Sequence, residues 1–216
     1  MRLRPALAAA ICLPLAACGS PSEPAESPSP SEPSTPERLT AVVEERLDFD
    51  ASSFTQGLEV GPGGDLYVGT GEWGESRVYR ERDGKEAASV SLAPQLFGEG
   101  ITLVNDHLWQ LTWQDHTAFK RDPETLAETG RASYDGEGWG ICYRQGAGEV
   151  IFSDGTDELR RMDPDTLAER ERFDVTLNGT EVPRLNELEC VGDEIYANVF
   201  LTTDIVRIDA TTGDVT

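Results

Sequence analysis

The sequence predicts an all-β protein, and three observations favour a β-propeller within that class. From about Thr40 onward, apolar and polar residues alternate with a period of two, between turns rich in Gly, Asp and Pro. No stretch of this region keeps a helical period. The third observation is an internal repeat, which a β-sandwich does not require.

The repeat has four visible units, whose first strands begin near Gln56, Glu99, Trp139 and Glu187, at spacings of 43, 40 and 48 residues. In each unit a second strand, a third strand, a turn and a fourth strand are expected to follow. Four short strands recurring at such a period are typical of a propeller blade. The segment 40–43 precedes the first unit and is expected to form a strand that closes the ring with the other end of the chain.

The N-terminal segment resembles a lipoprotein export signal. Arg2 and Arg4 precede a short apolar stretch, and small residues lead to Cys18. We therefore predict a signal peptide at 1–17, lipidation of Cys18, a disordered Pro/Ser/Glu-rich tether at 18–39 and the propeller domain at 40–216. An ordinary secretory signal is the alternative. The expected location is extracytoplasmic, with the membrane reached through the lipid anchor alone.

The charge balance restricts the partners. The chain has 40 acidic and 18 basic residues, a formal net charge of -22. Such a protein repels nucleic acid phosphates, so nucleic acid binding is not expected. A monomer is expected.

Two cysteines, Cys142 and Cys190, lie in the predicted domain at matching places in adjacent repeats. Export permits a disulfide between them. Two buried free thiols are an equally good interpretation of the sequence.

Six motifs in order resemble the plant and bacterial glutaminyl-peptide cyclotransferases, over roughly residues 40–216. The motifs are FTQGL at 54–58, FGEGIT at 97–102, GWG at 138–140, SDGT at 153–156, RLNELE at 184–189, and YANV at 196–199 followed by TDI at 203–205. The resemblance implies a five-bladed propeller with a central active site. It also implies conversion of N-terminal glutamine in peptides or proteins to pyroglutamate, with release of ammonia.

In that reaction the substrate's α-amine attacks its own side-chain amide. A free α-amine has a pKa of about 7.7–8.0, so part of it is neutral at pH 7. The site must hold a near-attack geometry, stabilise an oxyanion and protonate the leaving nitrogen. Glu99 matches the family's catalytic glutamate and is the candidate proton shuttle. Its alternative role is a structural carboxylate.

The resemblance assigns further site residues. Asn186 matches the active-site asparagine, and Trp113 and Trp139 match tryptophans that line the pocket. Gln56 is a candidate for the substrate pocket or for a position beside it. Glu187 and Glu189 are candidates only for positions beside the pocket. Trp73 and Trp109 are assigned to the core.

Two departures from the family pattern stand out. Phe200 replaces a pocket tryptophan, and the family's last blade, with an assisting lysine, has no counterpart before Thr216. The domain is therefore expected to be incomplete at its C-terminal end. No cofactor is required by the resemblance and no metal-site residues are assigned, although a structural calcium ion in the channel would suit the family. A non-catalytic extracellular propeller that binds a ligand or partner is the alternative function.

Overall fold

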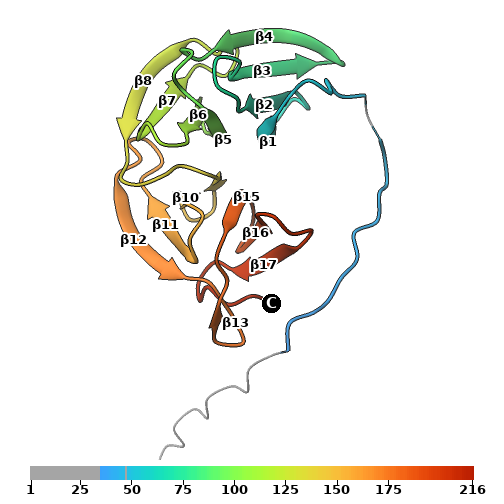
Figure 1. Ribbon diagram of the computed structural model, residues 1–216, viewed down its shortest axis with the longest axis vertical. Helices are drawn as coiled ribbons and strands as arrows, with labels where there is room; N and C mark the ends of the chain where they lie inside the picture. The colour runs from blue at the N-terminus through green and yellow to red at the C-terminus, as the bar shows by residue number, and fades with distance from the viewer. Residues whose placement is uncertain (1–34, 47) are drawn as a thin grey trace, which may run out of the picture. The chain divides into compact units, whose positions relative to one another are not determined.

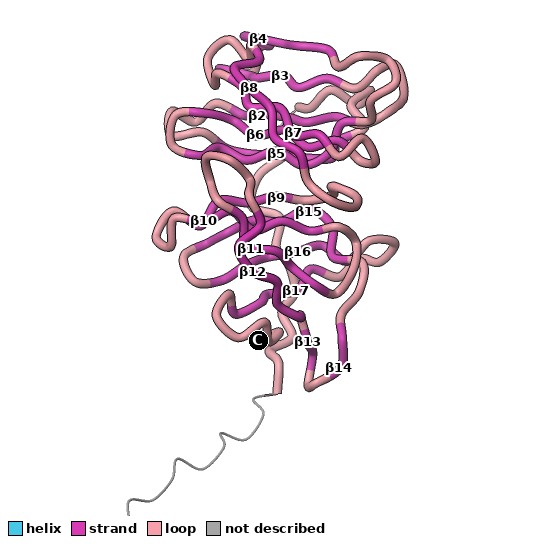
Figure 2. Tube along the Cα trace, turned by 90° about the vertical axis from the view of Figure 1, so that its left-hand side faces the viewer, coloured by secondary structure: helices cyan, strands magenta, loops and turns pink. Residues whose placement is uncertain are grey.

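Four antiparallel sheets stand around a common centre in the computed structural model, which describes residues 35–46 and 48–216 (Figure 1). Each sheet is one blade of a β-propeller, with its first strand near the centre and its last strand at the periphery. The side view shows strands and loops throughout the described part of the chain (Figure 2). No helix there is long and apolar enough to cross a membrane.

The blades are numbered 1 to 4 in chain order, from β1–β4 to β15–β17, and share one strand order from centre to edge. The first strands are β1 (Thr55–Val60), β5 (Gly98–Val104), β9 (Ile141–Arg144) and β15 (Leu185–Val191). The second strands are β2 (Leu66–Thr70), β6 (His107–Thr112), β10 (Glu149–Ser153) and β16 (Glu194–Val199). The third strands are β3 (Arg77–Arg82), β7 (Thr117–Arg121), β11 (Glu158–Met162) and β17 (Ile205–Asp209). The outer strands are β4 (Lys85–Ser91), β8 (Glu128–Ser133) and β12 (Glu169–Asp174).

Blade 4 differs at its outer edge. A small hairpin, β13 (Thr176–Leu177) with β14 (Thr180–Glu181), precedes it. Its three strands are followed by an isolated bridge between Ile208 and Val215, where the other blades have an outer strand.

The structure confirms the all-β propeller and the four repeats, but not every expected strand. The segment 40–43 has no strand structure, so the predicted closing strand is wrong. An apolar pair such as Val42 and Val43 does not form a strand without a neighbour to receive its hydrogen bonds, and both side chains are exposed. The predicted signal peptide, Cys18 and residues 18–34 of the tether lie outside the described residues.

Two blades have the same turn between their third and outer strands. Asp122 Oδ1 accepts hydrogen bonds from the backbone of Glu124 and Thr125, at 3.1 and 2.8 Å. Asp163 does the same for Asp165 and Thr166. Each turn then places a leucine, Leu126 or Leu167, at positive φ with its side chain in the core. The near-identical sequences of the two turns therefore have one structural cause, an Asp-capped turn that buries a leucine.

The first strands of neighbouring blades approach each other closely at glycine. A Cβ on Gly100 would lie 2.7 Å from the carbonyl oxygen of Trp139, and one on Gly140 would lie 2.1 Å from that of Asn186. Any larger residue would push the blades apart at these points. The glycines of the repeat thus bring Glu99, Trp139 and Asn186 to one end of the ring.

A disulfide joins Cys142 of blade 3 to Cys190 of blade 4. The Cα atoms are 5.5 Å apart, within the ordinary range for disulfides. Both cysteines pack in the apolar cluster between these blades. Of the two interpretations left open by the sequence, the structure shows the bonded one.

Candidate active site

Glu99 is a buried carboxyl group at the start of β5. The side chain is 5% exposed, and Oε2 accepts a hydrogen bond of 2.8 Å from Nε2 of Gln56 on β1. Burial raises the pKa of Glu99 to about 8, the Gln56 hydrogen bond opposes the rise, and the nearby negative charge of Glu137 adds to it. The group therefore keeps its proton at neutral pH. Because Gln56 occupies Oε2, that proton belongs on Oε1.

Trp113 and Trp139 flank the Glu99 strand on either side. The backbone amide of Trp113 donates to the carbonyl of Phe97 at 3.0 Å, and the amide of Gly100 donates to the carbonyl of Trp139 at 2.9 Å. Glu99 lies between Phe97 and Gly100 in the chain, at the start of β5. The expected convergence of Glu99 with both tryptophans at one mouth of the propeller is therefore present.

A carboxylate that the sequence reasoning missed connects the two tryptophans. Oε2 of Glu137 accepts hydrogen bonds from both indoles, at 2.7 Å from Trp113 and 2.9 Å from Trp139. Burial raises the pKa of Glu137, but hydrogen bonds from Gln114, Trp139 and Trp113 outweigh it and hold the value below its usual range. Glu137 is thus ionised and fixes the relative orientation of the two indoles. The sequence offered one signal for this role, because Glu137 directly precedes the GWG motif that contains Trp139.

The ring of Trp139 lies against backbone on one side. A Cβ on Gly155 would come within 2.6 Å of this indole, and Gly155 has φ of 80°. Glycine at this place in the SDGT motif thus lets the indole lie flat over the turn. On another side the indole meets Phe200, with ring centroids 5.3 Å apart. Phe200 therefore keeps the aromatic wall at the position where the resemblance leads one to expect a tryptophan.

Trp73 does not lie in the core, contrary to the prediction from the sequence. Its side chain is 52% exposed at the same mouth, so that prediction is wrong. Its ring contacts Phe97 and Trp113, with centroids 5.5 and 6.4 Å away. It lies in the loop between β2 and β3, which has no inward-facing side of a strand to bury an indole. Trp109, by contrast, is buried on β6 as expected, and its indole donates to the carbonyl of Pro164.

Hydrogen bonds of the Asn186 backbone connect this residue to the site. Its carbonyl accepts a 2.7 Å hydrogen bond from Oγ of Ser153, and the same Oγ accepts one of 2.8 Å from the amide of Gly140. Asn186 therefore lies beside the strand start that carries Trp139. This places it on the same mouth as Glu99 and the two tryptophans.

Glu187 lies deeper, in the centre of the ring. Both of its carboxylate oxygens are buried, and neither has a hydrogen-bond partner in the described part of the chain. Burial raises the pKa of Glu187 well above its usual range, and the negative charges of Glu99 and Glu59 raise it further. Glu189 is further still along β15 and lines the opposite end of the channel.

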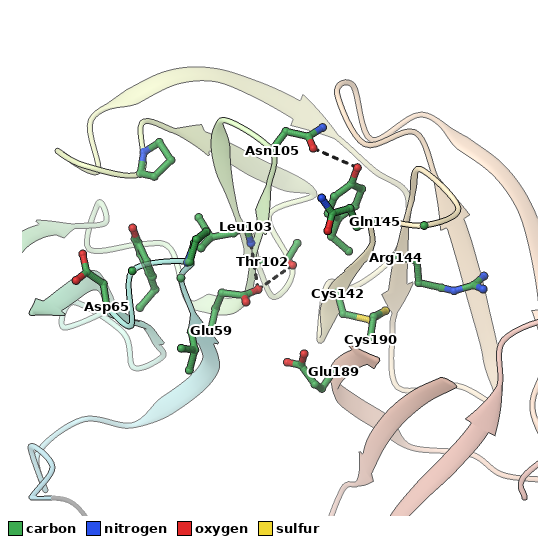
Figure 3. A pocket seen from close by; sticks show the side chains of 18 of the residues that line it. Glu59, Asp65, Thr102, Leu103, Asn105, Cys142, Arg144, Gln145, Glu189 and Cys190 are labelled. Atoms are coloured by element: carbon green, nitrogen blue, oxygen red, sulfur yellow. Dashed lines mark hydrogen bonds between the residues drawn. A yellow bond between two sulfur atoms is a disulfide. The ribbon is translucent and has the colours of Figure 1, made fainter. Parts of the chain in front are cut away.

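A cavity of about 750 Å³ opens at that opposite end (Figure 3). The Cys142–Cys190 disulfide and Glu189 border it, and Glu59 accepts a hydrogen bond from Thr102 at its rim. None of the predicted catalytic or substrate residues lines this cavity. Its size therefore does not mark it as the predicted site, because the titratable group with indoles around it is at the other mouth.

Comparisons with known proteins identify the family. The model of the glutamine cyclotransferase family matches residues 10–216. The chain is 36% identical over 168 residues to a glutaminyl-peptide cyclotransferase of Arabidopsis thaliana, covering 76% of this chain and 52% of the relative. It thus spans about half the length of that relative.

Solved structures give the same result. The crystal structure of Myxococcus xanthus glutaminyl cyclase superposes with a TM-score of 0.69 and 32% identity, covering 76% of this chain and 68% of the other. A virginiamycin B lyase from Staphylococcus aureus matches with a TM-score of 0.55 and 17% identity, covering 76% of this chain and 55% of the other, which shows the shared fold alone. The sequence motifs, the propeller and the family match together establish that this chain belongs to the glutamine cyclotransferase family.

Proposed function

We propose that the protein converts N-terminal glutamine of peptides or proteins to pyroglutamate and releases ammonia. The observation that carries the proposal is the buried Glu99 carboxyl group, held by Gln56 beside two indoles that share one carboxylate. A neutral acid next to an apolar, aromatic wall suits protonation of a leaving amine. Family membership gives the reaction class.

The reaction follows from this arrangement. The neutral α-amine of the substrate forms a bond to its own side-chain amide carbon, and the carbonyl oxygen becomes an oxyanion. Glu99 gives the proton on Oε1 to the departing nitrogen and regains one from the attacking nitrogen, so its protonation state is restored. The C–N bond of the amide breaks and ammonia leaves. Asn186 is proposed to donate its side-chain amide to the oxyanion.

Trp113, Trp139 and Phe200 have a different role in this proposal. They exclude water from the bound glutamine and hold its side chain folded back toward the α-amine. Gln56 orients the Glu99 carboxyl group.

The direct test uses a peptide with N-terminal Gln, with ammonia release and the accompanying loss of mass measured together. The same peptide beginning with Asn is the control, because its shorter side chain would close a strained four-membered ring. We expect turnover of the Gln peptide alone. Failure to release ammonia from any Gln peptide would leave the non-catalytic propeller as the better interpretation.

Replacing Glu137 by Gln tests the link between the tryptophans and Glu99. Both indoles donate to Oε2 in the parent, and a glutamine oxygen at that place carries no charge, so both hydrogen bonds are weakened. We expect KM to rise roughly tenfold, as for the loss of a hydrogen bond to a charged group. The pKa of Glu99 should fall because a neighbouring negative charge is removed. Measurement of KM and of the pH dependence of kcat/KM checks both effects, with Asp135→Asn as a control on the same loop. An unchanged KM and pH dependence would show that Glu137 does not position the indoles.

Calcium in the channel remains a proposal. The unpartnered oxygens of Glu187 are suitable hard donors once the group is ionised. In residues 35–46 and 48–216, however, no group of three or more His, Cys, Asp or Glu could hold a metal, so carbonyls and water would have to complete the coordination. We expect added calcium to raise the unfolding temperature, and Glu187→Gln to remove that increase. An equal increase in both proteins would place the ion elsewhere.

We also propose that the chain is exported, cleaved before Cys18 and anchored by a lipid on that residue, as an extracytoplasmic monomer. The small residues before Cys18 support this, and the Cys142–Cys190 disulfide suits an oxidising compartment. Metabolic labelling with a fatty acid should mark the protein, and Cys18→Ser should abolish the label. Labelling that survives the substitution would disprove the anchor site.

A further inference from the structure

An aromatic and acidic corner of blade 1 borders the mouth but has no part in the reaction described above. We call it the blade 1 corner; it consists of Phe54, Glu72, Trp73 and Glu75. Phe54 and Trp73 are 51% and 52% exposed, and both rings contact Phe97. Large aromatic rings exposed this far, and packed on one common ring, are typical of binding surfaces.

The loop that carries Trp73 is held in place. The carbonyl of Glu72 accepts hydrogen bonds from the amide and Oγ of Ser76, at 3.0 and 2.7 Å. Oγ of Ser76 in turn accepts the amide of Gly98, the residue before Glu99, at 3.0 Å. The corner is therefore fixed to the strand that carries the proposed proton shuttle.

The corner has negative charge. Glu72, Glu75 and Phe54 line a hollow of about 160 Å³, together with one cation, Arg77. That cation is already paired with Asp50 and Glu86, at 3.0 and 2.5 Å. The hollow therefore has two exposed carboxylates and one aromatic side chain, Phe54, on a protein whose net charge is -22. Trp73 does not line the hollow, but it lies between Glu72 and Glu75 in the same loop.

We propose that the blade 1 corner binds a cationic side chain, arginine best, of the residue that follows the substrate's N-terminal glutamine. A guanidinium group can stack on Trp73 and pair with a carboxylate at once, whereas an ammonium group offers a point charge without the planar stacking. The second residue of a bound peptide can reach the corner from the pocket. Trp73 contacts Trp113 of the pocket wall, and consecutive residues of an extended peptide advance by about 3.3–3.6 Å. This inference rests on the proposed function and names the class of substrate.

The test is a series of peptides that begin with Gln and differ only in the second residue: Arg, Lys, Ala or Glu. We expect kcat/KM to fall in that order at low salt. The advantage of Arg and Lys over Ala should shrink as the salt concentration rises, because exposed charges are screened beyond about 10 Å at 0.1 M.

Two variants separate stacking from charge. Trp73→Ala should lower kcat/KM for the Arg peptide by about two- to fivefold, the range of an exposed cation–π contact, and leave the Ala peptide nearly unchanged. The double variant Glu72→Gln/Glu75→Gln should lower kcat/KM for the Arg and Lys peptides alike and flatten their salt dependence. Its matched control is Asp83→Asn/Glu181→Gln, which removes the same two charges from exposed positions on blade 1's outer turn and on the hairpin β13–β14.

The outcomes keep this inference distinct from the proposed function. Turnover of the Ala peptide with no preference among the four peptides would overturn the cationic subsite and leave the activity intact. Equal effects of the two double variants would show general electrostatic attraction rather than binding at the corner, and would also overturn it. Absence of turnover for all four peptides would instead contradict the proposed function itself.

Discussion

Substitution of Glu99 by Gln is expected to lower kcat by about 10²–10⁴-fold, the usual contribution of a positioned acid or base. Glutamine has nearly the same shape and can still pair with Gln56, but it has no proton to transfer. The substrate pocket stays intact, so KM should change little. The measurement is ammonia release at saturating Gln peptide.

Unfolding cannot account for such a loss. The pKa of Glu99 is raised in the folded state, so its contribution to stability is complete below about pH 4.5 and is lost as the pH rises through about 8. The neutral Glu99→Gln variant lacks this loss and should be at least as stable as the parent at pH 8–9. Glu59→Gln is a matched control, because Glu59 is a carboxyl group of raised pKa at the other end of the channel. Full activity in Glu99→Gln would remove the residue from the proposed mechanism.

Removal of the Cys142–Cys190 disulfide is expected to have the largest effect on stability. The bond closes a loop with a sequence separation of 48, for which chain entropy predicts about 4 kcal/mol of stabilisation. For a domain of this size that corresponds to a fall of roughly 8–16 °C in unfolding temperature. The double variant Cys142→Ala/Cys190→Ala, followed by thermal unfolding, measures it.

A reducing agent gives the control. It should lower the unfolding temperature of the parent to that of the double variant and leave the variant unaffected. Activity at low temperature should be retained in both, because the disulfide is at the opposite end of the channel from Glu99. If the parent and the double variant unfold at the same temperature, the bond does not stabilise the contact between blades 3 and 4.

The repeated parts of the fold could be predicted from the sequence, because each repeat encodes the same local structure. The turns at Asp122 and Asp163 are near-copies that bury Leu126 and Leu167 identically. The prediction of a strand at 40–43 was wrong because alternation and β-branched residues indicate a strand but do not supply a partner strand. The Cys142–Cys190 bond was undecided because a match in the repeat does not fix how far apart two blades lie.

The candidate site, like the fold, could be predicted from the sequence only in part. Glu99 and Trp139 belong to motifs, and Trp113 was assigned to the pocket by the family resemblance, so their approach could be anticipated. Glu137 was missed because a glutamate in a turn carries no pattern of its own. Its role comes from the hydrogen bonds that it accepts from the indoles of Trp113 and Trp139, which the structure shows and the sequence does not. Trp73 was assigned to the core on its residue type, but the loop between β2 and β3 leaves it at the surface.

The most direct test of the central claim is the pH dependence of kcat/KM for a Gln peptide. Two groups should control it: the substrate amine, which must lose its proton, and Glu99, which must keep the proton that burial retains up to about pH 8. We expect a narrow maximum near pH 8 with a fall on both sides. In Glu137→Gln the alkaline side should move to lower pH while the acidic side stays in place. A rate that rises and then stays level up to pH 10 would contradict the claim that the neutral Glu99 carboxyl group is the proton donor.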